Sequence, residues 1–207
     1  MHVRATTIHA DLSRLDDGIA YVRVRIVPVV DSLPGSLGLS MLVDHDSGLV
    51  TITTAWASAQ ARSASDDELV VQRTEVAELL GGGPAASELL ELAVLDRVQP
   101  APPGAWSRTT RIRIDPHRVD SAVDAYSAST RHDLRLLDGY CSAVLLVDRA
   151  TGHGAVSVTL DSHEAMVASR APAAAIRAAG AAEIGAEVTD VRESEVVITG
   201  IRELVAG

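Results

Sequence analysis

The chain has 207 residues, of which 47% are hydrophobic and 2% are aromatic, and its formal net charge is −10. This composition supports one large domain or two small ones, whose cores must be built from Val, Leu, Ile and Ala. The acidic balance argues against a nucleic-acid partner, because affinity for nucleic acids comes mainly from basic side chains that contact phosphates.

The cysteine content and the hydropathy pattern bear on the compartment. The single cysteine, Cys141, allows no internal disulfide, which is typical of a reducing compartment. The N-terminal residues 1–14 lack the apolar core of a signal peptide, and no apolar run approaches the roughly 18 residues of a membrane span. We therefore expect a cytoplasmic protein without a membrane partner.

The first half of the chain contains several segments with strand character. Residues 3–10 form a short β-rich run. Residues 39–56 read as two strands joined by a tight turn at Asp-Ser-Gly, and residues 87–96 predict a last strand.

Two helices are predicted between these strands. Ser65 and Glu68 match a capping box, which predicts the start of a helix that continues through Leu80. Residues 21–30 alternate like a strand, but the matching segment of the second half has a helical pattern. We therefore expect a helix here, bent or ended near Pro28.

The second half follows a linker predicted at residues 98–106, which are rich in proline. Residues 107–114 predict a strand. Asp115 as N-cap and Pro116 in the first turn predict the start of a helix that ends by Gly139. The remaining predicted strands lie within residues 143–160 and 192–200.

The two halves are a tandem duplication. Asp44 and Asp148 stand 104 positions apart, and identical residues recur at the same offset without a gap. These pairs include Arg4 and Arg108, Thr6 and Thr110, Ile8 and Ile112, Ser58 and Ser162, and Arg73 and Arg177. Each copy has the element order β-α-β-β-α-β, which is the ferredoxin-like arrangement. We therefore predict an α+β protein with one repeat at residues 1–97 and another at 107–207, which bury their open sheet faces as one barrel-like body.

The repeats resemble the antibiotic biosynthesis monooxygenase (ABM) family of dimeric α+β barrels. The likeness lies in the Pro-Gly or Asp-Gly before the second strand, the Leu-Val-Asp…Gly hairpin, the Trp-x-Ser-x-x-Ala after the third strand and the closing Glu-x-x-Val strand. It covers nearly all of both copies. Two chains of this family usually associate to complete the barrel, so the resemblance implies an intramolecular pseudo-dimer, with a further homodimer left open.

The resemblance also implies activities that can be compared with the residues. Heme-degrading relatives depend on an Asn on the first strand, a Trp that ends the third strand and a helical His roughly ten residues later. Trp56 matches that Trp, but Asp66 stands ten residues on, with Arg170 as its counterpart, and the chain contains no Asn. The cofactor-free oxygenases of polyphenolic polyketides also use an Asn. The resemblance therefore implies a fold and a cleft, without heme or another cofactor, and leaves the catalytic residues unknown.

Trp56 is the main candidate for a ligand-binding residue, because it occupies the family's cleft position between sheet and helices. Its counterpart is Leu160, so the asymmetry predicts a site in the first repeat. The other ligand-binding candidates are His9, Tyr21 and Thr54. The alternative is that Trp56 only fills a core that lacks Phe.

Other polar residues suggest alternatives. The seven histidines show no metal-binding spacing, so we expect no metal site. Tyr126 and His132 would reach a cleft in the second repeat if one is open. Arg111 and Arg113, which alternate with isoleucines, indicate either an interior ionic network or an anionic-ligand site.

Two hypotheses for the function follow. The first is a cofactor-independent monooxygenase that acts on a small aromatic or polyketide-like molecule. The second is a non-catalytic small-molecule-binding or interaction protein that keeps the fold only.

Overall fold

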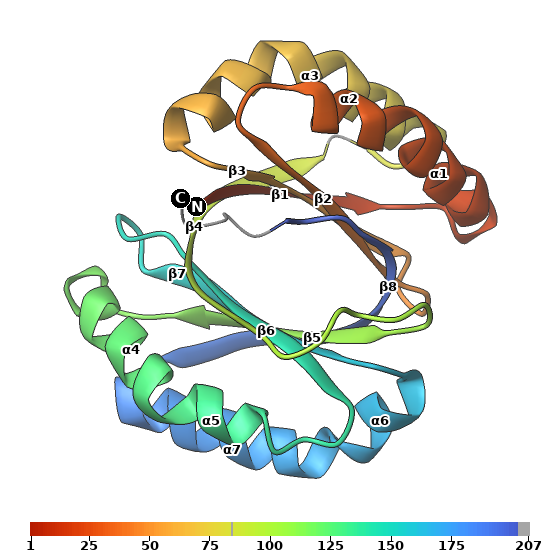
Figure 1. Ribbon diagram of the computed structural model, residues 1–207. Helices are drawn as coiled ribbons and strands as arrows, with labels where there is room; N and C mark the ends of the chain where they lie inside the picture. The colour runs from red at the N-terminus through yellow and green to blue at the C-terminus, as the bar shows by residue number, and fades with distance from the viewer. Residues whose placement is uncertain (84, 203–207) are drawn as a thin grey trace. The chain divides into compact units, whose positions relative to one another are not determined.

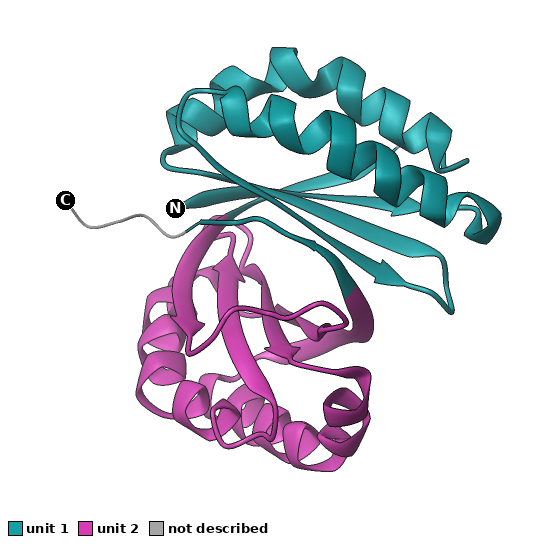
Figure 2. Cartoon of the chain, turned by 45° about the vertical axis from the view of Figure 1, so that its right-hand side comes forward, with its two compact units in different colours: residues 1–90, 196–207 teal, residues 91–195 magenta. Residues whose placement is uncertain are grey.

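The computed structural model describes residues 1–83 and 85–202, and its elements follow the order predicted for two β-α-β-β-α-β repeats (Figure 1). The chain consists of two compact units (Figure 2). Unit 1 comprises residues 1–90 and the chain from Val196 onward, and unit 2 comprises residues 91–195.

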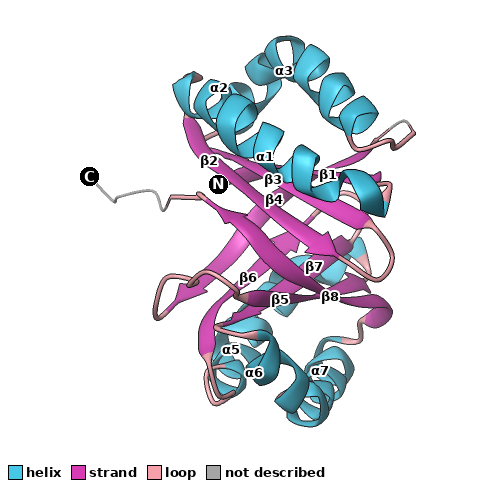
Figure 3. Ribbon diagram, turned by 90° about the vertical axis from the view of Figure 1, so that its right-hand side faces the viewer, coloured by secondary structure: helices cyan, strands magenta, loops and turns pink. Residues whose placement is uncertain are grey.

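Unit 1 places its helices on one face of an antiparallel sheet (Figures 1 and 3). The central strand β3 pairs with β1 on one side and with β2 on the other, so that Thr54 lies opposite both Arg4 and Leu39. In chain order the elements are β1 (His2–His9), α1 (Leu15–Tyr21), a π-helical segment (Val22–Ile26), α2 (Val27–Ser32), β2 (Ser36–Asp44), β3 (Leu49–Trp56) and α3 (Ala59–Leu79).

Unit 2 repeats this arrangement. Its central strand β7 pairs with β5 and β6, and Val158 lies opposite both Arg108 and Ala143. The elements are β5 (Trp106–Arg113), α4 (Val119–Ala125), a π-helical segment (Tyr126–Thr130), α5 (Arg131–Leu134), β6 (Tyr140–Val147), β7 (His153–Leu160), α6 (His163–Ala168) and α7 (Arg170–Ile184).

The closing strands β4 (Ala86–Arg97) and β8 (Glu187–Thr199) each begin in one unit and end in the other. Residues 91–97 of β4 pair with β6, and residues 187–195 of β8 pair with β5. The strand order, β1-β3-β2-β8-β5-β7-β6-β4, is that of a closed barrel. The predicted fold class, two ferredoxin-like repeats forming a fused α+β barrel, is confirmed.

The compact units do not coincide with the predicted repeats, because the end of each closing strand packs with the other repeat's unit. The units divide between Leu90 and Glu91 and between Glu195 and Val196. The predicted linker corresponds to the loop between the end of β4 at Arg97 and the start of β5.

Two local predictions for the first repeat require correction. Helix α3 begins six residues before the predicted capping box: Ser58 is its N-cap and accepts from the Ala61 amide at 3.0 Å. Ser65 lies inside the helix, and its hydroxyl donates to the carbonyl of Arg62 at 2.7 Å. The helix also continues past Pro28, because this proline stands in the first turn of α2, where a missing N–H costs little.

Each unit has its own hydrophobic core between helices and sheet. The core of unit 1 contains Val22, Met41, Trp56 and Leu80. Its counterpart in unit 2 is built from Val119, Tyr126, Leu145, Leu160 and Met166. Over the residues that the structure describes, no helix has the length and apolar character needed to cross a membrane.

Candidate functional site

Each unit contains a cavity that is lined by residues from its sheet and its helices. The cavity of unit 1, here called cavity 1, has a volume of about 40 Å³. Cavity 2, in unit 2, has a volume of about 70 Å³. Both linings are mainly apolar. Their polar side chains come from the first strand and the second long helix of each repeat, from Thr54 of β3 in cavity 1, and from Tyr126 and Thr130 of the π-helical segment in cavity 2.

The two cavities are duplicates of each other. Every lining residue of cavity 1 except Leu39 has its counterpart 104 positions later in the lining of cavity 2. Three polar pairs are identical in type: Arg4 and Arg108, Thr6 and Thr110, and Arg73 and Arg177. The duplication therefore preserved a buried guanidinium, a hydroxyl and a second guanidinium at each cavity.

The larger cavity lies in the second repeat, which differs from the expectation of a site in the first repeat. Side-chain size on the second long helix explains the difference. Leu69 and Val76 of α3 are replaced in cavity 2 by Ala173 and Gly180 of α7, which leave space beside the sheet.

The four predicted ligand-binding residues lie in three places. Trp56 is fully buried, and its indole Nε1–H donates to Thr54 Oγ1 at 3.2 Å. The described lining of cavity 1 includes Thr54 but not Trp56, His9 or Tyr21. His9 is exposed at the end of β1, and the Tyr21 hydroxyl donates to Glu75 at 2.8 Å on the surface of unit 1. The structure brings Trp56 and Thr54 together, and the ligand-binding role of all four stays a prediction.

In cavity 1, Arg4 is only 4% exposed and forms an ion pair with Asp66 of α3. Burial lowers the pKa of Arg4, and the nearby Asp66 carboxylate partly offsets this effect. Among the described residues, Arg4 Nη1, Arg73 Nη1 and Gln72 Oε1 have no hydrogen-bond partner although they are buried. Asp66 occupies the position of the heme-degrading family's helical His and here serves as the partner of a buried arginine.

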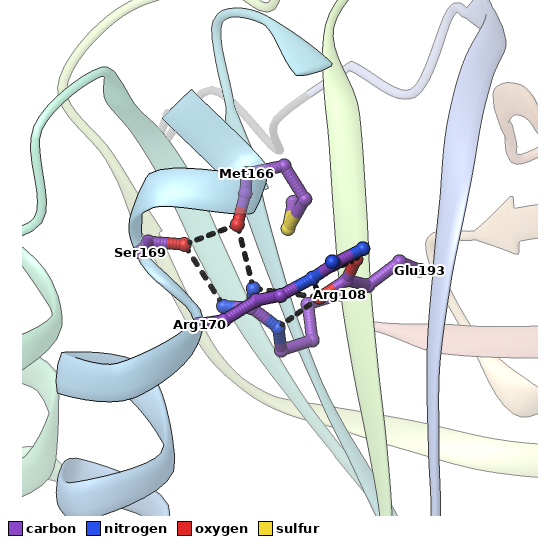
Figure 4. A network of polar contacts seen from close by, with 5 residues as sticks. All are labelled: Arg108, Met166, Ser169, Arg170 and Glu193. Atoms are coloured by element: carbon purple, nitrogen blue, oxygen red, sulfur yellow. Dashed lines mark hydrogen bonds and ion pairs between the residues drawn. The ribbon is translucent and has the colours of Figure 1, made fainter. Parts of the chain in front are cut away.

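In cavity 2, each of the three guanidinium nitrogens of the equivalent arginine makes a hydrogen bond (Figure 4). Arg108 donates from Nε to Glu193 Oε1 at 3.0 Å, from Nη1 to Ser169 Oγ at 3.1 Å and from Nη2 to the Met166 carbonyl at 2.8 Å. Arg170 Nη2 also pairs with Glu193, at 2.8 Å. Burial alone would raise the pKa of Glu193, but hydrogen bonds from Arg170 and Arg108 outweigh it and hold this pKa below its usual value.

Tyr126 and Arg177 also line cavity 2. Tyr126, in the π-helical segment, is 5% exposed, and its hydroxyl has no hydrogen-bond partner among the described residues. Burial raises the pKa of Tyr126, as does the charge of Asp96. The pKa of Arg177 is lowered by burial and by the neighbouring Arg108. π-helical segments are frequent at functional sites, and this one is repeated at Val22–Ile26.

The sequence contained a signal for the arginines of both cavities, because they recur in identical register. On that strand Arg111 is half-buried and Arg113 exposed, whereas Arg108 is buried, so the ionic network or anionic-ligand site expected at Arg111 and Arg113 stays a prediction. Within the described part of the chain, there is no group of three or more His, Cys, Asp or Glu side chains placed to hold a metal ion.

Comparisons with known proteins identify close relatives. No family model matches the sequence. The chain is 37% identical over 202 residues to "Uncharacterized protein Rv2557" of Mycobacterium tuberculosis (strain ATCC 25618 / H37Rv), with 98% of this chain and 90% of that protein covered. It is 37% identical over 203 residues to "Uncharacterized protein Rv2558" of the same strain, with 98% and 86% covered.

Solved structures share the fold at low sequence identity. An anthrone oxidase-like protein has a TM-score of 0.67 and 15% identity, over 94% of this chain and 90% of that one. A ferredoxin-fold protein related to antibiotic biosynthesis monooxygenases, from Listeria monocytogenes 4b F2365, has a TM-score of 0.54 and 8% identity, over 95% of each chain. The predicted resemblance to the ABM-like α+β barrels is therefore confirmed at the level of the fold.

Proposed function

This chain belongs to the same family as the Mycobacterium tuberculosis proteins Rv2557 and Rv2558, and from cavity 2 we propose that it binds a small, mainly apolar molecule that carries one phenolic or carboxylate oxygen. The observation that carries the proposal is that Tyr126 and Arg177 both line cavity 2, and that the buried hydroxyl of Tyr126 has no hydrogen-bond partner among the described residues.

The chemistry of the lining supports such a ligand. Ile112, Val156 and Ile176 provide apolar walls, against which an alkyl or aryl group is stabilised by burial. Leaving a buried hydroxyl without a partner costs about 1–3 kcal/mol, so a ligand oxygen that bonds Tyr126 recovers that free energy. The guanidinium of Arg177 favours an anionic oxygen over a neutral one.

The size of the cavity limits the ligand. Its volume of about 70 Å³ is smaller than the about 150 Å³ of an engineered protein cavity that holds benzene. A neighbouring cavity of about 30 Å³ shares Ile112, Tyr126, Val156 and Ile184 with it. Even together the two spaces are smaller than the engineered cavity, so a ligand with one ring is the upper limit, and its entry requires side chains such as Tyr126 to move.

A panel of ligands tests the proposal. We expect benzoate and 4-hydroxybenzoate to raise the melting temperature of the protein, because a ligand that binds only the folded state stabilises it, whereas cyclohexanol should have a smaller effect. Tyr126→Phe, which keeps the ring, should weaken the response to 4-hydroxybenzoate. Equal responses to all compounds, or none to any, would contradict the proposal.

A cofactor-independent monooxygenase is the second candidate. It is favoured by the fold shared with the anthrone oxidase-like protein and by the two arginines of cavity 2, which would stabilise a phenolate. Burial raises the pKa of the Tyr126 hydroxyl, so it is a poor proton acceptor at neutral pH, and the guanidinium groups of Arg108 and Arg177 offer N–H donors only. They can therefore stabilise an anion more readily than abstract a proton, and the binding function is better supported.

Oxygen uptake separates the two candidates. Oxygenation of the one-ring substrate hydroquinone to 2-hydroxy-1,4-benzoquinone consumes one O₂ and releases one water. Oxygen consumption that is faster with the protein than in buffer alone, and that returns to the buffer rate in Arg177→Gln, would support the monooxygenase function. Ligand binding without oxygen consumption would support the binding function and contradict the monooxygenase function.

A further inference from the structure

We propose that cavity 1 is a second binding site, of different specificity, which takes a small planar monoanion such as a short-chain carboxylate through Arg4, Gln72 and Arg73. The inference is independent of the function proposed for cavity 2, because it depends on polar groups of unit 1 that differ from their counterparts.

The first observation is the incomplete bonding of two arginines. Arg4 uses Nη2 for its ion pair with Asp66 and for a 3.5 Å hydrogen bond to the Arg62 carbonyl, while its buried Nη1 makes no hydrogen bond to the described residues. Arg73 donates from Nη2 to the Asp66 carbonyl at 3.1 Å, and its buried Nη1, which lies 3.9 Å from Asp66 Oδ1, also lacks a hydrogen bond to the described residues. Both side chains line cavity 1.

The second observation is a difference in the carboxylates of the two repeats. Arg108 is neutralised by Glu193, whose side chain is 19% exposed. The counterpart of Glu193 in the first repeat is Leu89, and Arg4 has Asp66 instead, whose side chain is 45% exposed and therefore solvent-screened. A bound carboxylate would supply to Arg4 the buried negative charge that Glu193 supplies to Arg108.

The local charge has the sign that a monoanion requires. Arg4 and Arg73 contribute two positive charges and Asp66 one negative charge, and Arg62 lies close enough to add positive potential at Arg4. The group therefore carries a net positive charge, which one bound monoanion reduces without reversing its sign. Two guanidinium groups also favour a planar ligand, since each presents its N–H donors in one plane.

The volume limits the size of the anion. Each water requires roughly 10–15 Å³ of such space, so a cavity of about 40 Å³ holds about three waters. This is the size of formate, acetate, nitrate or bicarbonate. The walls formed by Ile8, Val30 and Leu69 would accept the methyl group of acetate. Gln72 Oε1 would accept the hydroxyl of bicarbonate, and rotation of the amide would turn its NH₂ group toward a carboxylate instead.

Trp56 supplies a reporter that is specific for this cavity. Its indole N–H donates to Thr54 Oγ1, and Thr54 lines cavity 1. The sequence has two tryptophans, so Trp106→Phe leaves Trp56 as the only one. Trp106 is half-buried and stacks on His163 with ring centroids 4.2 Å apart, a contact that Phe can retain.

The test is a titration of the Trp106→Phe protein with sodium acetate, nitrate or bicarbonate against chloride at constant ionic strength, while Trp56 emission is recorded. We expect a saturable change with at least one planar anion and none with chloride. Arg73→Gln should weaken this response at least tenfold, whereas its matched control in cavity 2, Arg177→Gln, should leave it unchanged.

Several outcomes would overturn the proposal: a fluorescence change that does not saturate, one that chloride reproduces, or one that survives in Arg73→Gln. Each would show that the change does not arise from a planar anion bound at Arg73. If Arg73→Gln does not fold, as judged by circular dichroism, Gln72→Leu takes its place. It removes the amide at similar volume and should reduce affinity for bicarbonate more than for nitrate. If Gln72→Leu binds bicarbonate and nitrate with the same affinities as the parent protein, the role assigned to Gln72 is overturned. If the response of the parent protein does not saturate, the site itself is overturned.

Discussion

Arg4 and Arg108 occupy the same position in the two repeats, are each 4% exposed, and are neutralised from different elements of their units. Asp66 of α3 pairs with Arg4, while Glu193 of β8 pairs with Arg108. The carboxylate that pairs with the buried arginine therefore comes from a helix in the first repeat and from a strand in the second. At the second-repeat position equivalent to Asp66 the residue is Arg170. This change distinguishes the two cavities.

The first prediction concerns the strength of these ion pairs. Glu193→Gln removes the main partner of a buried arginine and should lower the free energy of unfolding by about 3 kcal/mol. Asp66→Asn, at a more exposed carboxylate, should cost about 1 kcal/mol or less. Urea unfolding followed by circular dichroism measures both, and equal losses would argue against the different burial of the two pairs.

The second prediction concerns acid stability. Asp96 is buried, and hydrogen bonds from Arg135 and Tyr140 hold its pKa below the usual value although burial opposes this. A carboxyl with a lowered folded-state pKa contributes stability above its unfolded pKa of about 3.9, and this contribution is lost as pH falls through the folded-state pKa. Melting temperatures between pH 7 and pH 2 should therefore fall less steeply in Asp96→Asn than in the parent, from a lower starting value. Parallel curves would show that Asp96 does not contribute to acid unfolding.

The third prediction concerns cavity size. Leu69→Ala gives cavity 1 the side chain found in cavity 2 and should cost about 2–5 kcal/mol, because it removes buried methyl groups and leaves a larger void. The reciprocal change, Ala173→Leu, enters existing space and should cost less than about 1.5 kcal/mol while blocking ligands of cavity 2. A large loss of stability in Ala173→Leu would indicate that cavity 2 cannot accept added volume.

The fourth prediction concerns Trp56. Trp56→Leu reproduces the residue found at this position in the second repeat, Leu160. Because Trp56 is fully buried, the smaller side chain should leave a void and lower the free energy of unfolding by about 2–4 kcal/mol. Thermal unfolding checks this value. If the free energy of unfolding changes little, the core of unit 1 repacks around leucine without leaving a void.

The fold could be predicted because its signals are local and were repeated. The gapless offset joined segments whose individual patterns were ambiguous, such as residues 21–30, and the helix there is confirmed. The helix start assigned to Ser65 was wrong, because a capping pattern inside a helix looks the same in sequence, and the N-caps of α3 and α6 are Ser58 and Ser162.

The site was harder to predict because its geometry depends on long-range packing. Arg4, Thr6 and Ile8 share one face of β1, but the sequence does not show that this face meets helices and a cavity. The volume of each cavity depends on the size of side chains that are distant in sequence from the strand, such as Leu69 in cavity 1 and Ala173 in cavity 2. The unpartnered hydroxyl of Tyr126 likewise becomes visible only when every neighbour has been placed.

The central claim is that cavity 2 binds a small ligand with an acidic oxygen, and calorimetric titration with 4-hydroxybenzoate tests it most directly. We predict saturable binding to the parent protein, at least tenfold weaker binding to Arg177→Gln, and unchanged binding to Arg73→Gln, the same substitution in cavity 1. Absence of heat at millimolar ligand, or equal weakening by both substitutions, would contradict the account.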